Sequence, residues 1–136
     1  MLIGGGCEPL LAAQCRSLLA GVAVGRVAVT VAGLPVIAPV DFALVDDDVV
    51  FRVEADGPLH SATDGAVIAF EADGCRTDAR TGWIVLAIGR ADTIADVEER
   101  VAVARRRGVP SLSDGREALV RLRPEMLAGR RLAFTD

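Results

Sequence analysis

The sequence contains no lysine, tyrosine or asparagine, and all 15 of its basic residues are arginine. Without lysine the chain cannot form a Schiff base with a substrate or with pyridoxal phosphate, and without tyrosine it has no phenolic acid or base. Aromatic residues make up only 4% of the chain, and 19 acidic residues outnumber the basic ones. We therefore expect no binding of nucleic acid, because positive charge and stacking surfaces are both scarce.

Histidine and cysteine are also rare. His60 is the only histidine, and the three cysteines, Cys7, Cys15 and Cys75, form no CxxC pair. A zinc site would need carboxylates to complete its ligands, so we expect no metal centre. An odd number of cysteines at unrelated spacings predicts no disulfide framework and favours a reducing, cytoplasmic compartment.

Long apolar runs are missing as well. The longest uncharged stretch, residues 27–40, is interrupted by Gly33, Pro35 and Pro39. As a helix it would reach about 21 Å, short of the roughly 30 Å hydrocarbon core of a bilayer. Met1 to Gly6 lacks the positive segment of a signal peptide. A length of 136 residues with 51% hydrophobic content predicts one globular domain, residues 1–136, with no membrane partner.

The hydrophobic pattern changes from helical to strand spacing along the chain. Helices are predicted from Pro9 to Val22, at 58–64 and at 96–107. Strands are predicted at 26–31, 36–45, 49–53, 66–71 and 83–94, with two short ones at 119–123 and 130–134, and a polar loop at 73–82. Successive strands joined by short turns predict antiparallel pairing, and hence an α+β fold with a closed or half-closed barrel.

Three local features refine this pattern. Pro39 lies inside a strand, where its missing N–H predicts a sheet edge or a bulge. The acidic triplet 46–48 is predicted to be a turn, because calcium ligands would be spaced and accompanied by a turn glycine. Asp96 and Glu99 have the spacing of a capping box at a helix start.

No conventional catalytic motif is present: the chain has no GxSxG elbow, Walker loop or GxGxxG after a strand. His60 and Asp64 could face each other one helical turn apart, but Ser61 is adjacent to His60 and would point elsewhere. A structural pairing is therefore favoured over a triad, and we assign no catalytic residue. Asp41 lies in an apolar strand and needs a partner, for which Arg26 or Arg90 is expected.

Arg52 precedes a helix that is predicted to begin at Pro58 and to carry Ser61 and Thr63. A guanidinium beside a helix N-terminus and hydroxyl groups can form a phosphate site, because hydrogen-bond donors and the helix dipole converge there. The same arginine could instead pair with Glu54 or Asp56 on the surface. Residue types alone leave both interpretations open.

Several short segments are individually unspecific but occur in an informative order. They are Leu18-Leu19-Ala20, Val24-Gly25-Arg26-Val27, Pro35 to Phe42, Val49-Val50-Phe51-Arg52, Ala66 to Glu71, Thr81-Gly82-Trp83-Ile84-Val85, Val120 to Glu125 and Gly129-Arg130-Arg131-Leu132. In this combination the chain resembles the pyridoxamine 5′-phosphate oxidase-like family. The resemblance implies a split β-barrel with flanking helices, usually a homodimer, with FMN in a cleft at the dimer interface.

In that family the flavin phosphate is typically held by the arginine after the third strand's aromatic residue and by a lysine a few residues later. Arg52 matches the arginine, whereas Pro58 stands at the lysine position and supplies no charge. Val53 stands where threonine is common, and Leu119 where tryptophan is common. These departures indicate a weakened or lost phosphate site.

The resemblance predicts an FMN site at Arg52, Val53, Pro58, His60, Ser61 and Trp83. His60, if protonated, could partly replace the lysine, and Trp83 could wall a ring-binding cleft, although core or dimer packing is its commoner role. The implied function is an FMN-dependent oxidoreductase of unknown small-molecule substrate, the hydride chemistry belonging to the flavin. A deazaflavin-binding relative and a cofactor-free dimeric module are the alternatives. Pyridoxamine-phosphate oxidase activity itself is not expected, because no second basic cluster is present for that substrate's phosphate.

Overall fold

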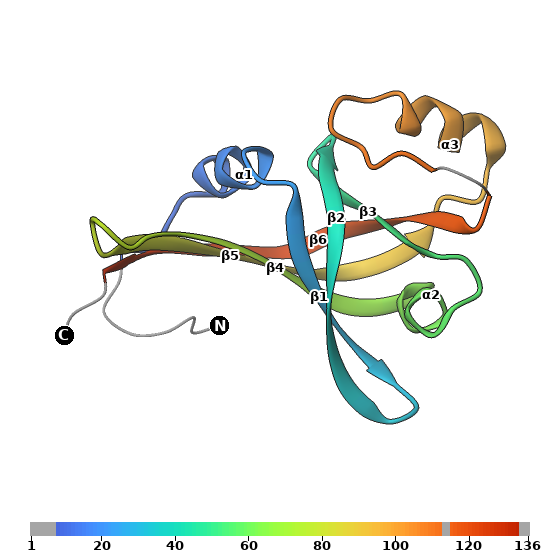
Figure 1. Ribbon diagram of the computed structural model, residues 1–136, viewed down its shortest axis with the longest axis horizontal. Coiled ribbons are helices and arrows are strands. Elements are labelled where there is room, and N and C mark those ends of the chain that lie inside the picture. Colours follow the sequence, from blue (N-terminus) through green and yellow to red (C-terminus); the bar gives the residue numbers. More distant parts are fainter. Residues whose placement is uncertain (1–7, 113–114, 134–136) are drawn as a thin grey trace.

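The computed structural model describes residues 8–112 and 115–133. Six antiparallel strands close into a barrel in the order β1-β2-β3-β6-β5-β4 (Figure 1). The elements along the chain are α1 (Ala12–Ala20), β1 (Val24–Val31), β2 (Leu34–Val45), β3 (Asp48–Glu54), α2 (Pro58–Thr63), β4 (Ala66–Arg76), β5 (Thr81–Thr93), α3 (Val97–Ala104) and β6 (Glu117–Ala133). The predicted α+β class and antiparallel barrel are confirmed. In the described part of the chain, no helix has the length and apolar character needed to cross a bilayer.

The acidic triplet forms the predicted turn between β2 and β3. Val45 pairs with Asp48, and the two residues between them, Asp46 and Asp47, have φ angles of 50° and 70°. Two positive φ angles in a two-residue hairpin loop match the right-handed twist of the flanking strands, and aspartate tolerates this conformation. Counting outward from this turn, Phe42 lies opposite Phe51.

Strand β2 changes partner along its length. Its first part, from Leu34 to Asp41, pairs with β1, and its second part, from Phe42 to Val45, pairs with β3. Pro39 lies in the first part, opposite Arg26 of β1. The proline ring is exposed and lies where β2 has no β3 partner, so the predicted sheet edge is confirmed. The β1–β2 hairpin projects beyond the rest of the barrel (Figure 1).

The C-terminal strand is longer than the pattern predicts. We expected two short strands, but β6 is one strand of 17 residues that pairs with β3 and with β5. The register with β5 shifts between Ile88 and Gly89, so that Gly89 pairs with Pro124 and the extra residue, Glu125, forms a bulge. Gly89 permits this close approach, because a Cβ there would lie 1.9 Å from the Arg123 carbonyl oxygen.

The predicted polar loop at 73–82 is also mostly strand. Strands β4 and β5 pair outward as far as Arg76 and Thr81, leaving only residues 77–80 as the turn. The prediction was wrong because polar side chains do not prevent a strand whose neighbours supply every ladder bond. This extended hairpin and β6 form the long arm of the sheet in Figure 1.

Two clusters of buried side chains hold the fold together. The larger fills the barrel and includes an edge-to-face contact of Phe42 with Phe70, whose ring centroids are 4.7 Å apart. The smaller lies between the barrel and α3 and consists of Val45, Val50, Ile94, Val103 and Leu119. Neighbouring residues of β3 point alternately into these two clusters, since Val49 and Phe51 belong to the first and Val50 to the second.

The helices begin and end inside their predicted limits. Helix α1 starts at Ala12 rather than Pro9, because Pro9 forms an isolated bridge with Arg130. Helix α3 has the predicted cap, in which Asp96 accepts a hydrogen bond from the Glu99 N–H at 2.9 Å. It ends at Ala104 instead of residue 107. Predictions that concern residues 1–7, or residue 134 at the end of the last expected strand, fall outside the described residues.

Candidate functional site

Arg52 lies near the end of β3 and points away from the barrel interior. Its neighbours Phe51 and Val53 are buried in the barrel core, and the alternation of a strand places Arg52 on the opposite face. The side chain is 29% exposed. Val53 therefore turns its side chain away from any ligand that contacts Arg52.

The guanidinium of Arg52 already has oxygen partners on three sides. Nη2 donates to Asp41 Oδ2, and Nη1 donates to the carbonyl oxygen of Ser111 at 2.7 Å. Nε lies 3.7 Å from Glu117 Oε1. The arginine thus links β2, β6 and the segment that follows α3.

The partner expected for Asp41 was wrong. Arg26 instead binds Glu71 at 2.6 Å and Asp73 at 2.7 Å, while Arg90 lies against Asp92. Arg52 is the partner of Asp41 instead of Arg26 or Arg90, because β2 leaves β1 after Asp41 and continues beside β3. The alternative pairing of Arg52 with Glu54 or Asp56 is not among its contacts in the described part of the chain.

As arranged, these side chains do not fit a phosphate group. One guanidinium and two carboxylates carry a formal net charge of −1, whereas a phosphate monoester carries about −1.5 to −2 at neutral pH. A phosphate would have to displace a carboxylate or share the guanidinium with it. We therefore derive no chemical step through a phosphate bound at Arg52.

His60 fastens α2 to β5. Its Nδ1 accepts a hydrogen bond from the Asp56 N–H at 3.0 Å, and its Nε2 lies 2.8 Å from Thr93 Oγ1. Because Nδ1 accepts a hydrogen bond, the neutral tautomer with a proton on Nε2 satisfies both contacts. Both ring nitrogens of His60 are thus engaged within the chain, and Pro58, exposed at the start of α2, contributes no N–H.

Asp64 reaches the same threonine. Its Oδ1 accepts a hydrogen bond from the Thr93 N–H at 2.8 Å, and this bond holds the pKa of Asp64 below its ordinary value. His60 and Asp64 therefore meet at Thr93, and the exposed Ser61 takes no part. The contact that we expected directly between His60 and Asp64 is made through Thr93, a residue that no local sequence pattern indicated.

Trp83 lies far from this group, near the other end of β5. It is ten positions before Thr93 in β5, which corresponds to about 33 Å of extended strand. Its indole covers Gly74, where a Cβ would lie 2.5 Å from Nε1, and it borders a hollow of about 340 Å³ that also includes Cys75 and Arg131. The predicted flavin residues thus form two separate groups within one chain.

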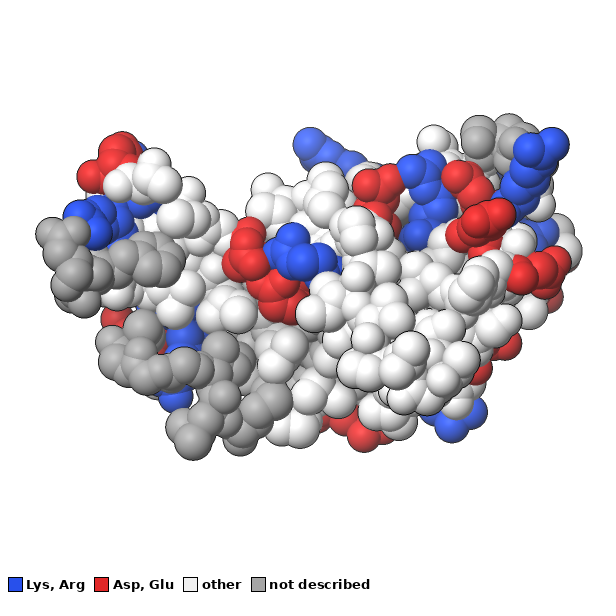
Figure 2. Space-filling view, turned by 60° about the horizontal axis from the view of Figure 1, so that its bottom comes forward, with Lys and Arg blue, Asp and Glu red and all other residues white. Residues whose placement is uncertain are grey.

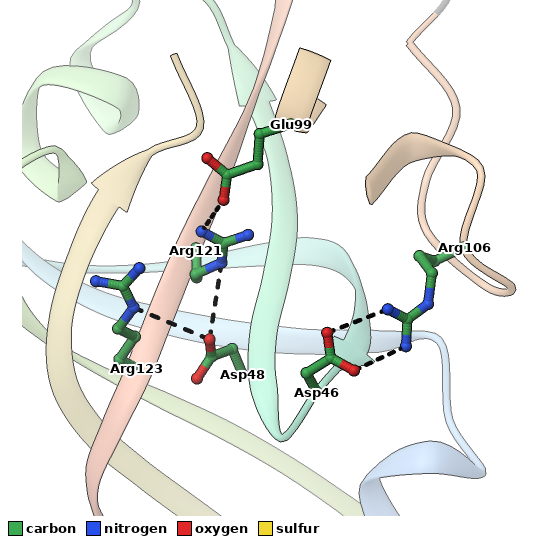
Figure 3. Close-up of polar contacts among 6 residues, drawn as sticks. All are labelled: Asp46, Asp48, Glu99, Arg106, Arg121 and Arg123. Carbon is green, nitrogen blue, oxygen red and sulfur yellow. Dashed lines mark hydrogen bonds and ion pairs between the residues drawn. The ribbon is translucent and has the colours of Figure 1, made fainter. Parts of the chain in front are cut away.

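A polar cluster that sequence reasoning missed holds α3 to the barrel (Figure 3). Arg121 of β6 is only 16% exposed and binds Glu99 at 2.6 Å, with Asp48 at 3.7 Å. Burial raises the pKa of Asp48, and the nearby Arg121 opposes this shift. Arg106 makes two bonds to Asp46, of 3.0 and 3.1 Å, and lowers the pKa of that carboxyl.

Large apolar side chains are exposed on the strands. Ile37 of β2 is 73% exposed, and Leu34 and Val67 are each 67% exposed. Figure 2 turns the β1–β2 side of the molecule towards the viewer and shows a broad uncharged area with groups of both signs around it. Exposed apolar surface of this kind is typical of a contact with another molecule.

Comparison with known proteins assigns the chain to a family. The family model described as pyridoxamine 5′-phosphate oxidase matches residues 12–131. The chain belongs to this family. The resemblance seen in the sequence is therefore confirmed, over nearly all of the described residues.

Similar proteins match this chain over most of its length. An uncharacterised protein of Mycobacterium tuberculosis, Rv0080, is 37% identical over 124 residues, which cover 88% of this chain and 81% of that protein. A structure of the FAD binding protein from Mycobacterium smegmatis is 31% identical, covers 94% of this chain and 100% of its own, and superposes with a TM-score of 0.84. A conserved protein of unknown function from Corynebacterium diphtheriae, DIP1874, is 27% identical, with coverage of 95% and 98% and a TM-score of 0.75.

Proposed function

We propose that this protein binds a flavin nucleotide and serves as a flavin-dependent oxidoreductase. The observation that carries the proposal is the likeness, over the full barrel and at 31% identity, to a mycobacterial protein that binds FAD. A bound flavin supplies hydride or electron transfer, and the protein binds the ring and orients it. FMN was the expected cofactor, and FAD now stands beside it as a candidate.

A second copy of the chain completes the proposed site. The Arg52 group and Trp83 lie too far apart in one chain to contact the same flavin. Pairing of two chains through exposed apolar residues such as Ile37 and Val67 would bury that surface and could bring Trp83 of one chain towards Arg52 of the other. The homodimer and the cytoplasmic location both remain predictions.

One observation favours a second candidate, a dimeric barrel without a cofactor. Arg52 is neutralised by Asp41 and Glu117, and Pro58 provides no positive charge. Either the flavin is held mainly through its ring and sugar chain, or the site has been lost. A deazaflavin remains a third possibility for the ring.

The deciding experiment is a visible spectrum of the purified protein followed by titration with riboflavin, FMN, FAD and a deazaflavin, read by flavin fluorescence. Light scattering after size-exclusion chromatography gives the mass of the particle. We expect saturable binding of one flavin per chain, with a particle of two chains. A colourless protein that quenches none of these flavins at concentrations up to about 100 μM would overturn the flavin proposal in favour of the cofactor-free barrel.

The Trp83→Phe variant tests the role of the indole in that titration. If Trp83 walls the ring, flavin affinity should fall while the mass of the particle stays unchanged. An unchanged affinity would place the flavin away from Trp83. The Cys75→Ser variant is a matched control, because Cys75 lines the same hollow without presenting a ring.

A further inference from the structure

A guanidinium can bind an oxyanion through either of two edges, and in Arg52 both edges already face oxygen atoms of the protein. One edge is formed by Nε and Nη2, which face Glu117 and Asp41. The other edge is formed by Nη1 and Nη2, which donate to Ser111 O and Asp41. Bidentate recognition of a phosphate needs two N–H groups of one edge pointing at the ligand. Asp41 accepts from Nη2, the nitrogen that belongs to both edges.

The cluster is open enough for a ligand to reach it. The side chain of Asp41 is 47% exposed, that of Arg52 29% and that of Glu117 25%. Access therefore does not decide what binds at Arg52. Charge does, because an approaching anion meets one positive and two negative groups.

Flavins differ in the charge they bring to such a site. Riboflavin has no phosphate, whereas FMN ends in a monoester whose second pKa is near 6, so that it carries about −1.5 to −2 at pH 7. In FAD the two phosphates are joined as a pyrophosphate with an ester bond at each end, and they carry one negative charge each. The Arg52 cluster penalises the most concentrated of these charges, the FMN monoester.

We infer that Asp41 is a specificity-determining residue, which accepts a hydrogen bond from Nη2, the nitrogen that both edges of the Arg52 guanidinium share, and selects against a flavin with a terminal phosphate. The inference rests on the proposed flavin function and defines which flavin the site takes. Without the Asp41 charge, Arg52 faces one carboxylate instead of two, and a phosphate meets a group with no formal net charge. With the Asp41 charge present, the affinity for a flavin comes from parts of the molecule other than a terminal phosphate.

The test uses the Asp41→Asn variant of the full chain, titrated with FMN and with riboflavin. Asparagine has the same shape and keeps an oxygen that can accept a bond from Arg52. We expect the Kd of FMN to fall at least tenfold, the scale of one charge-assisted contact, and that of riboflavin to change less than about twofold. The readout is the Kd of FMN divided by the Kd of riboflavin. A change in binding of the ring, which both ligands share, cancels in this ratio.

Two variants control the interpretation. Asp78→Asn makes the same charge change at an exposed ion pair with Arg76, in the turn at the far end of β4 and β5, and should leave the ratio unchanged. In the Arg52→Ala background, Asp41→Asn should produce no gain for FMN. A gain of equal size in Asp78→Asn, or one that persists without Arg52, would overturn the inference, as would an unchanged ratio in Asp41→Asn.

The same experiment distinguishes a failure of the flavin proposal from a failure of the inference about Asp41. If neither riboflavin nor FMN binds wild type or variant, the flavin function is refuted, and inorganic phosphate becomes the probe. Thermal unfolding is then compared in sodium phosphate and in sodium chloride of equal ionic strength. A phosphate-specific rise in Tm for Asp41→Asn, absent from wild type and from Asp78→Asn, supports the role of Asp41, and its absence overturns it.

Discussion

Replacing Gly25 by alanine tests how closely the ring of Phe70 in β4 packs against the neighbouring strand β1. A Cβ at position 25 would lie 2.3 Å and 2.4 Å from the Cζ and Cε2 atoms of Phe70, against 3.4–4 Å for an ordinary contact. The ring would have to move by more than 1 Å, but it is fully buried and its other side contacts Phe42. Glycine is needed at position 25 because the Phe70 ring fills the space that a Cβ would occupy.

The size of the effect follows from the atoms involved. Overpacking of a filled core costs about 1–3 kcal/mol, and the confined ring places Gly25→Ala near 3 kcal/mol. Phe70→Leu should cost about 1.5 kcal/mol by itself. Leucine lacks the two ring atoms that meet the new methyl group. The double variant should therefore lose roughly 2.5 kcal/mol instead of about 4.5, a coupling of about 2 kcal/mol.

Urea unfolding followed by circular dichroism provides these free energies by linear extrapolation. The matched control is Gly21→Ala, which changes a glycine with φ −91° whose Cβ would meet only ordinary contacts, the nearest at 3.5 Å. It should lie within about 0.5 kcal/mol of wild type. A Gly25→Ala protein as stable as this control, or a strictly additive double variant, would refute the packing argument.

Three further predictions concern polar contacts. The Thr93 N–H lowers the pKa of Asp64, so the carboxylate stabilises the fold above the unfolded-state value of 3.8, and this contribution is lost as the pH falls through the lower folded value. Asp64→Asn should thus destabilise the protein by no more than about 1 kcal/mol at pH 7 and by less near pH 2. Urea titrations at both pH values measure the difference in unfolding free energy from wild type. A difference that is larger in acid than at pH 7 contradicts the assignment. Around α3, Arg121→Ala should cost about 1.5–3 kcal/mol, because it leaves Glu99 and the half-buried Asp48 without this partner. Arg106→Ala should have a small effect on Tm that disappears in about 0.5 M NaCl, and a loss that persists at high salt would show that the pair with Asp46 is more than a screened surface contact.

The order of strands and helices could be predicted because each element has its own hydrophobic period. The continuity of β6 could not, because Pro124 interrupts a strand pattern in any local window. Only the register with β5 shows that the proline lies at a bulge, where its missing N–H breaks no regular ladder. The same applies to the paired residues of the β4–β5 arm, whose polarity suggested a loop.

At the site, the importance of Arg52 was predictable, but its partner was assigned wrongly. The signal that identifies Asp41 was present in the sequence. A two-residue turn at 46–47 places residue 45 opposite residue 48, and counting outward brings Asp41 beside Arg52. The contacts of His60 and Asp64 with Thr93 had no such signal, since Thr93 lies 33 and 29 positions later in the chain and the docking of α2 depends on the closed barrel.

The position of β6 between β3 and β5 has a consequence for the order in which the chain folds. The β1–β2, β2–β3 and β4–β5 pairings join neighbours in sequence, whereas β3 reaches a partner about 70 residues later, with Val53 beside Ala118. Hairpins of the first kind can form in microseconds, but the last seam must wait until residues 117–122 have left the ribosome. Until then β3 and β5 both present open edges, so the nascent chain is most exposed to aggregation just before its final strand is made.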